Sequence, residues 1–135
     1  MDKALNYMAL ARKAGRIELG EEPVGAAARA GHARLVVVAS DASDHTWRRA
    51  KSYVAGTNQQ CIRLPYSKDD MGMAIGRTSL AIAAFTDAAL ALAFLKSLPK
   101  QEPEALAAIT EQTRRVQQRQ KEAKAHLKNV KKGKK

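Results

Sequence analysis

Apolar and polar positions alternate along the first part of the chain in segments that predict short helices and strands in turn. The clearest strand covers residues 35–39, which are apolar at every position. A strand without polar alternation has both faces covered, as in the centre of a layered α/β sheet. The Ala-rich segment before it, with Pro23 in its first turn, predicts a helix that ends at Gly31. Other segments must therefore supply helices for both sides of this strand.

The surrounding segments repeat the same order of helix and strand. Further helices are expected over residues 3–14, 43–55, 67–75 and 87–98, and further strands over residues 16–19, 61–64 and 80–85. Ser67 and Asp70 have the spacing of a capping box, which marks the start of a helix. Regular alternation of this kind is typical of a sheet between two layers of helices. We therefore expect an α/β fold, with residues 1–98 forming one domain.

Residues 99–135 differ in character. From Glu104 the chain contains no Gly or Pro until Gly133, and small or apolar residues recur every three or four positions, as in a heptad register. Polar residues such as Thr113 and Gln120 weaken that seam, so the pattern favours a largely helical, solvated arm over a stable coiled coil. We expect a basic C-terminal extension, helical or disordered, whose last five residues are disordered. Its expected phosphate contacts are Lys131, Lys132, Lys134 and Lys135.

Charge is the most informative feature of the composition. The net charge is +11 at pH 7, and it is unevenly distributed. Residues 96–135 hold 12 Lys and Arg against 4 Asp and Glu, whereas residues 1–95 hold 12 against 9. This balance predicts a polyanionic partner, with nucleic acid favoured over an anionic membrane. The alternative is that the basic tail only solubilises the chain.

The sequence contains no pattern that catalysis, a metal ion or a cofactor requires. Cys61 is the only cysteine, so no disulfide framework or cysteine-based metal site is expected; its place in a strand predicts a buried apolar role. Three histidines lack the spacing of metal ligands, and the glycines fit neither a dinucleotide-binding nor a phosphate-binding loop. We therefore expect a protein that is not an enzyme and has no cofactor.

No membrane span or targeting segment is expected either. The N-terminus passes directly into an amphipathic pattern, and the most apolar run, residues 80–95, is too short to cross a bilayer. We expect a cytoplasmic protein without a membrane partner.

Four stretches, ALARKAG, LGEE, AGHARLVVVASDAS and LPYSKDDMGMAIG, together resemble a known family over residues 3–96. They are similar to the small RNA-binding ribosomal proteins of the L-seven-Ae and L-thirty-e superfamily, and most of all to its bacterial members. The resemblance implies a three-layer α/β/α sandwich with a central mixed sheet that binds kink-turn RNA. The implied partner is structured RNA, either ribosomal RNA or a leader RNA, and the resemblance also implies association with the ribosome. We expect a monomer.

In this superfamily the turn before the second helix reads the sheared G·A pairs of the kink. Here Gly20 matches the family's glycine, Glu22 stands at the place of its Asn, Pro23 at that of its Glu and Ala26 at that of its Lys. A carboxylate can accept a hydrogen bond from a guanine amino group, but Pro23 and Ala26 offer neither a hydrogen bond nor a charge. An alternative function is therefore a protein-interaction module of the same fold that binds RNA only non-specifically, through its basic tail.

A second contact region of the superfamily is the loop before the fourth helix. There the resemblance implies that Tyr66 stacks on a base and that Ser67 and Lys68 bind a phosphate; the alternative is that Ser67 only caps the helix and Tyr66 covers the sheet edge. Arg16, Arg34 and Arg77 either surround the same surface or are solvated charges. The candidate RNA-binding residues are Arg16, Gly20, Glu21, Glu22, Leu64, Pro65, Tyr66, Ser67 and Lys68.

Overall fold

The computed structural model describes residues 2–133, with side chains up to residue 126. The helices are α1 (Lys3–Lys13), α2 (Glu21–Arg29), α3 (Asp44–Val54), α4 (Lys68–Ala74), α5 (Ala88–Ser97) and α6 (Pro103–Gly133). The strands are β1 (Ile17–Leu19), β2 (Leu35–Val38), β3 (Gln60–Arg63) and β4 (Ile82–Phe85). The expected order of helices and strands is confirmed.

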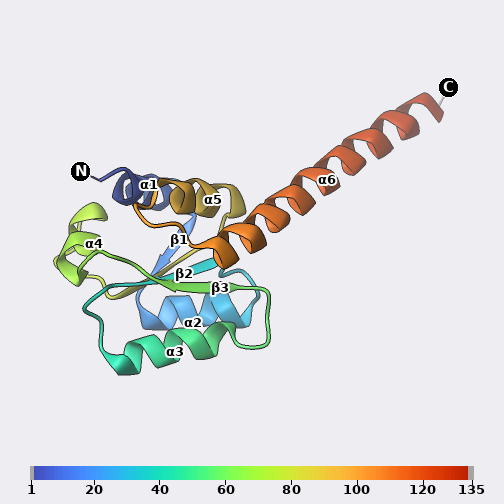
Figure 1. Cartoon of the computed structure of the whole chain (residues 1–135). Helices are drawn as coiled ribbons and strands as arrows, with labels where there is room; N and C mark the ends of the chain where they lie inside the picture. The colour runs from blue at the N-terminus through green and yellow to red at the C-terminus, as the bar shows by residue number, and fades with distance from the viewer. Residues whose placement is uncertain (1, 134–135) are drawn as a thin grey trace.

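The four strands form one mixed sheet in the order β1-β4-β2-β3. Only β2 and β3 pair in parallel, whereas β4 is antiparallel to both of its neighbours. Helices α2 and α3 cover one face and α1 and α5 the other, with α4 at one end (Figure 1). All residues of β2 and β4 are buried because both strands lie inside the sheet between these layers. The α/β/α sandwich with a mixed sheet is therefore confirmed.

The predicted start of the helix at Ser67 is also confirmed by its hydrogen bonds. The Ser67 hydroxyl accepts a hydrogen bond from the Asp70 N–H, and the Asp70 carboxylate reaches back to the Ser67 N–H, which completes the capping box. The strand expected over residues 80–85 begins later, at Ile82. Leu80 lies outside it because its N–H donates to the Lys68 carbonyl, 2.9 Å away, and so ties the chain to α4.

The first turns of α6 pack on the α/β/α sandwich. The heptad-like pattern of this segment predicted a solvated arm and did not indicate this packing. Ala105 and Ile109 are buried, and α6 contacts α5 and β3. The amide of Gln112 donates to the Asn58 carbonyl (3.0 Å) and accepts from Arg34 Nη1 (3.4 Å). Beyond these contacts the helix extends away from the sandwich (Figure 1), so the expected solvated arm begins only there.

The end of α6 includes some of the lysines that were predicted to contact phosphates. The backbone of residues 131–133 is helical, so the expected disorder is wrong there; uninterrupted helix-forming residues lead up to Gly133. The side chains of Lys131 and Lys132, and the whole of Lys134 and Lys135, lie outside the described residues. Their phosphate contacts stay a prediction.

Candidate nucleic-acid interface

The sheet brings both predicted contact regions to one of its ends. The Gly20 N–H donates to the Ile82 carbonyl, the Ser40 N–H to the Tyr66 carbonyl and the Leu64 N–H to the Val38 carbonyl, at 2.8–3.0 Å. We call this end, formed by residues 20–22, 40–41 and 65–68, the recognition end. Its outer parts follow β1 and β3, the two edge strands, which puts them about 14 Å apart at the usual strand spacing.

Gly20 shapes the turn between β1 and α2. Its φ of +96° belongs to a region that residues with a Cβ rarely adopt, and it serves as the N-cap residue of α2 without a side chain. A Cβ built at this position would come no closer than 3.8 Å to Pro23, so backbone conformation, and not space, requires the glycine. The turn leaves the first N–H groups of α2 beside two carboxylates, those of Glu21 and Glu22.

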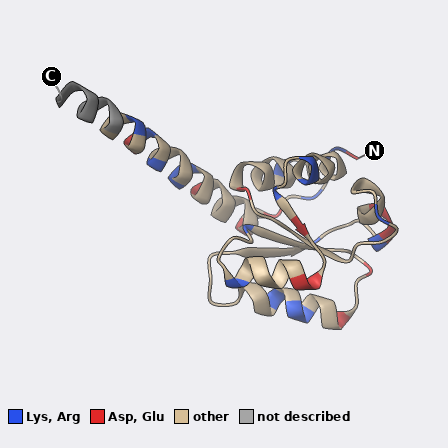
Figure 2. Cartoon of the chain, turned by 180° about the vertical axis from the view of Figure 1, so that it is seen from behind, with Lys and Arg blue, Asp and Glu red and all other residues tan. Residues whose placement is uncertain are grey.

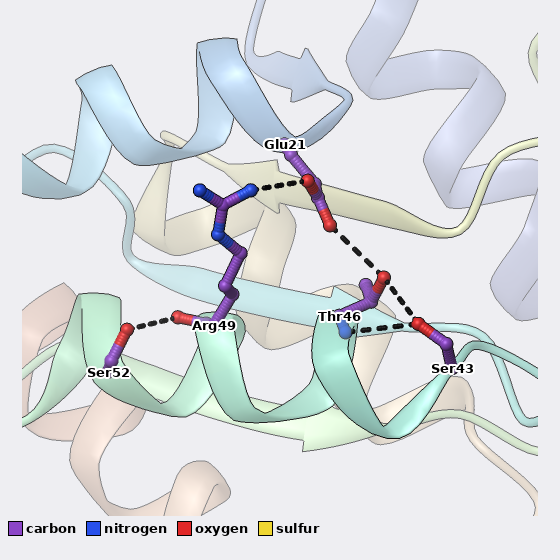
Figure 3. A network of polar contacts seen from close by, with 5 residues as sticks. All are labelled: Glu21, Ser43, Thr46, Arg49 and Ser52. Carbon is purple, nitrogen blue, oxygen red and sulfur yellow. Dashed lines mark hydrogen bonds and ion pairs between the residues drawn. The ribbon is translucent and has the colours of Figure 1, made fainter.

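Glu21 and Glu22, which are adjacent in the sequence, have different surroundings. The Glu21 carboxylate accepts hydrogen bonds from Thr46 Oγ1 (3.1 Å) and Arg49 Nη1 (3.0 Å), and Ser43 continues this network at the start of α3 (Figure 3). Glu21 therefore links α2 to α3. Glu22 is exposed, so of the two carboxylates it is the one that can meet a ligand.

The loop before α4 is more deeply buried than the resemblance implied. Leu64 is 2% exposed and Tyr66 8%, and the Tyr66 hydroxyl donates to Asp2 Oδ1 at 2.7 Å. Burial, followed by the hydrogen bond to Asp2, raises the pKa of Tyr66 well above its ordinary value. This burial leaves little surface of Leu64 or Tyr66 for a nucleotide, against the expectations that Tyr66 stacks on a base and that Leu64 is one of the RNA-binding residues. Pro65 alone of the three is exposed.

The start of α4 is also partly occupied. Ser67 caps the helix, and the Lys68 N–H donates to Asp41 Oδ1 at 2.8 Å. A carboxylate of the same chain therefore takes the place at this N–H that the sequence predicted for a phosphate. The ammonium group of Lys68 is the remaining cationic feature of this loop.

Carboxylates are concentrated at this end of the sheet. Acidic residues in the first turns of α2, α3 and α4, together with the loop residue Asp41, make up the group Glu21, Glu22, Asp41, Asp44, Asp69 and Asp70. In Figure 2 several red segments lie at the end of the body away from α6, and others lie in the middle of the body and on α6. A helix N-terminus stabilises a carboxylate in its first turn. A group of carboxylates, however, repels a polyanion such as RNA. The sequence alone did not predict that these residues would lie at the same end of the sheet.

Arg16 lies at the other end of β1, apart from the recognition end. It lines a hollow of about 570 Å³ between the edge of β1 and α2. The residues that line this hollow are Arg16, Glu18, Pro23, Ala26, Ala27, Ala30, His32, Arg34 and Thr86. Arg34 lines this hollow together with Arg16, so neither of the two surrounds the loop before α4, as one reading of the sequence had it. Arg77 does not line the hollow, since it follows α4 and its N–H donates to the Gly72 carbonyl.

The described residues offer no metal site, because no three His, Cys, Asp or Glu side chains among them gather closely enough. No helix within the described part of the chain is both long and apolar enough to cross a membrane.

Cys61 should react very slowly with iodoacetamide. Burial raises the pKa of its thiol to about 12, and the nearby charge of Lys51 offsets only part of this effect. At pH 8 the reactive thiolate is then on the order of 10⁻⁴ of the total. Mass spectrometry of the native chain at pH 8 should show alkylation at least a hundredfold slower than in urea. Equal rates would show that the thiol is accessible and weakly perturbed.

Comparisons with known proteins identify a relative in sequence and two similar structures. No protein-family model matches the chain. It is 35% identical, over 75 residues, to "RNA-binding protein YlxQ" of Enterococcus faecium; these residues make up 56% of this chain and 72% of that protein.

Two solved structures are similar in fold. One is a protein of unknown function from Bacillus halodurans C (TM-score 0.63, 24% identity), covering 82% of this chain and 99% of that one. The other is the Giardia lamblia 15.5kD RNA binding protein (TM-score 0.60, 17% identity), covering 79% of this chain and 84% of that one.

The sequence match, together with the fold, supports a small α/β/α domain of the L-seven-Ae and L-thirty-e superfamily. Within that class, the chain belongs to the family of RNA-binding protein YlxQ.

Proposed function

We propose that this chain is a non-catalytic RNA-binding protein that recognises structured, kink-turn-like RNA with its recognition end. One observation carries the proposal: the fold puts the Gly20 turn, the exposed Glu22 and the loop of residues 65–68 at the same end of the sheet. Family membership supports RNA as the ligand, since the relative is named as an RNA-binding protein. The proposed target is ribosomal RNA or a structured leader.

Glu22 is the residue that we assign to base recognition. It stands in the first turn of α2, two residues after the positive-φ glycine Gly20, and its carboxylate is exposed. A carboxylate accepts hydrogen bonds only, so it pairs with the amino group of guanine and not with its carbonyl or ring acceptor atoms. Lys68, on the other side of this end, would contact a phosphate as a point charge.

The test is a binding titration of the full chain at about physiological salt, where electrostatic attachment is already weakened. It compares a kink-turn RNA with the same duplex lacking its G·A pairs. We expect the kink-turn RNA to bind at least tenfold more tightly. Glu22→Ala should remove most of that preference, a loss of about 1–3 kcal/mol if a guanine contact is worth what base contacts usually are.

Glu104→Ala is the matched control, because it removes an exposed carboxylate from the first turn of another helix, α6. It should leave the preference unchanged. Both variants carry one negative charge less, so any general gain in affinity cancels between them. If Glu22→Ala kept the full preference, base recognition would have to be assigned elsewhere.

A second candidate is a protein-interaction module of the same fold. The acidic recognition end favours it, as does the exposure of two apolar side chains, Leu10 (49%) and Met73 (73%). Such a module would bind both RNAs of the titration equally, and its affinity would depend on the basic arm. That result would replace the first proposal by the second.

A further inference from the structure

An RNA ligand needs cationic partners for its phosphates, and the recognition end supplies few. Lys68 is one, whereas Arg49 is already paired with Glu21 at 3.0 Å. The phosphate contacts of the proposed function must therefore come from another surface that the same RNA can reach.

The hollow between β1 and α2 is such a surface. Helix α2 begins at the recognition end and runs along the hollow for 9 residues, about 13 Å at the usual rise. At its far end lie the exposed side chains of Arg16 and His32 and the half-buried Arg34. Within the described part of the chain, Arg16 and His32 make no side-chain hydrogen bond or ion pair.

The part of the hollow that α2 lines is formed by small residues. Ala26 and Ala30 are exposed along α2, and Pro23 stands at its start. Short side chains leave the hollow open, so a sugar–phosphate strand can approach the helix closely. The replacement of a lysine by Ala26, relative to the superfamily pattern, removes a charge here but widens the path.

The same surface continues onto α6. A neighbouring hollow of about 300 Å³ shares Arg34 and Thr86 with the first and is lined by Gln117 and Gln120 of α6. The contact between Gln112 and Arg34 fixes the helix at this junction. The α6 arm is therefore held where the groove ends.

The lysines that follow lie on the same stripe of α6. Residues four apart on a helix are neighbours on one face, so Lys121 follows Gln117 and Lys124 follows Gln120. Arg114 and Arg115 are less available, because both pair with Glu111, at 2.6 and 3.3 Å.

We infer that Arg16, His32, Arg34, Lys121 and Lys124 form one phosphate track for the backbone of the RNA. It begins at the far end of the β1–α2 hollow, passes Thr86 and continues along α6. Two carboxylates border it, Glu18 in the hollow and Asp87 at the junction, and Asp87 is held by the N–H of Leu90 at 2.9 Å. The inference rests on the proposed function, since it supplies the phosphate contacts that the recognition end lacks.

The test removes three charges from the track of the full chain: Arg16→Gln, Lys121→Gln and Lys124→Gln. The control removes three exposed charges from other faces: Arg12→Gln, Arg48→Gln and Arg77→Gln. Both triple variants have a net charge three lower than the +11 of the unmodified chain. Affinity for the kink-turn RNA is then measured between 50 and 300 mM salt, with thermal unfolding recorded for each variant.

Each lost phosphate contact should lower the slope of log affinity against log salt by about 0.7–0.9. The track variant should therefore lose about 2 from its slope and bind at least tenfold more weakly at physiological salt, with the preference for the kink retained. The control should lose less than 0.5. Equal losses in both variants would overturn the track and keep RNA binding, whereas no binding by the unmodified chain would overturn the proposed function and the track with it.

Discussion

Replacing Gly72 with alanine should lower the free energy of unfolding by about 2–4 kcal/mol, because overpacking against rigid neighbours is costly. A Cβ at this position would lie 2.7 Å from the Ser79 N atom, 2.8 Å from its Cα and 2.9 Å from the Arg77 carbonyl oxygen. All three are backbone atoms, so no side-chain rotation can relieve the contact. The loop after α4 would have to move, which would also disturb the hydrogen bond from the Leu80 N–H to the Lys68 carbonyl.

Gly25→Ala is the matched control for this substitution. It is also a buried helical glycine, but its Cβ would meet side-chain atoms, the Tyr53 ring at 3.2 Å and Arg29 Nη1 at 3.3 Å. These groups can shift, and alanine favours the helix by up to about 1 kcal/mol. Urea unfolding followed by circular dichroism should therefore show a much smaller loss than for Gly72→Ala. Similar losses would mean that the loop after α4 yields easily.

The elements could be predicted from the sequence because their signals are local. The capping box at Ser67, the apolar run of β2 and the end of α2 near Gly31 each depend on a few neighbouring residues. The sheet topology also brings the Gly20 turn and the loop before α4 to the same end of the domain. The family resemblance implied this arrangement, but sequence spacing alone does not indicate it.

The environment of individual site residues could not be predicted, since it depends on distant partners. Tyr66 is buried against Asp2, which lies 64 residues away, and Lys68 is engaged by Asp41, 27 residues away. Each residue type is also common on RNA-binding surfaces, so composition favoured the wrong interpretation. The docking of α6 depends in the same way on Gln112 reaching Asn58.

This docking explains why the basic arm and the domain should act together. A tail joined by a flexible linker would add phosphate contacts in any direction, whereas an arm fixed beside Arg34 can only continue a path that begins at the β1–α2 hollow. The stability of the domain and the direction of the arm then depend on the same few contacts of α6.

Ile109→Ala should consequently destabilise the whole domain, by about 2–4 kcal/mol, as is usual when a buried Ile is truncated. The Ile109 side chain is completely buried on the body, four residues beyond the buried Ala105. Val116→Ala, further along the same helix and only partly buried, should cost less than about 1 kcal/mol and serves as the control. Both are measured by urea unfolding of the full chain.

The same pair of variants separates a docked arm from an independent one. If α6 is docked, Ile109→Ala lowers the unfolding midpoint of the domain, and the salt dependence of RNA binding changes in the folded variant because the arm no longer continues from Arg34. If the midpoint is unchanged, α6 folds without support from the sandwich. The lysines of the arm would then contribute charge without direction, and the phosphate track would end at the hollow between β1 and α2.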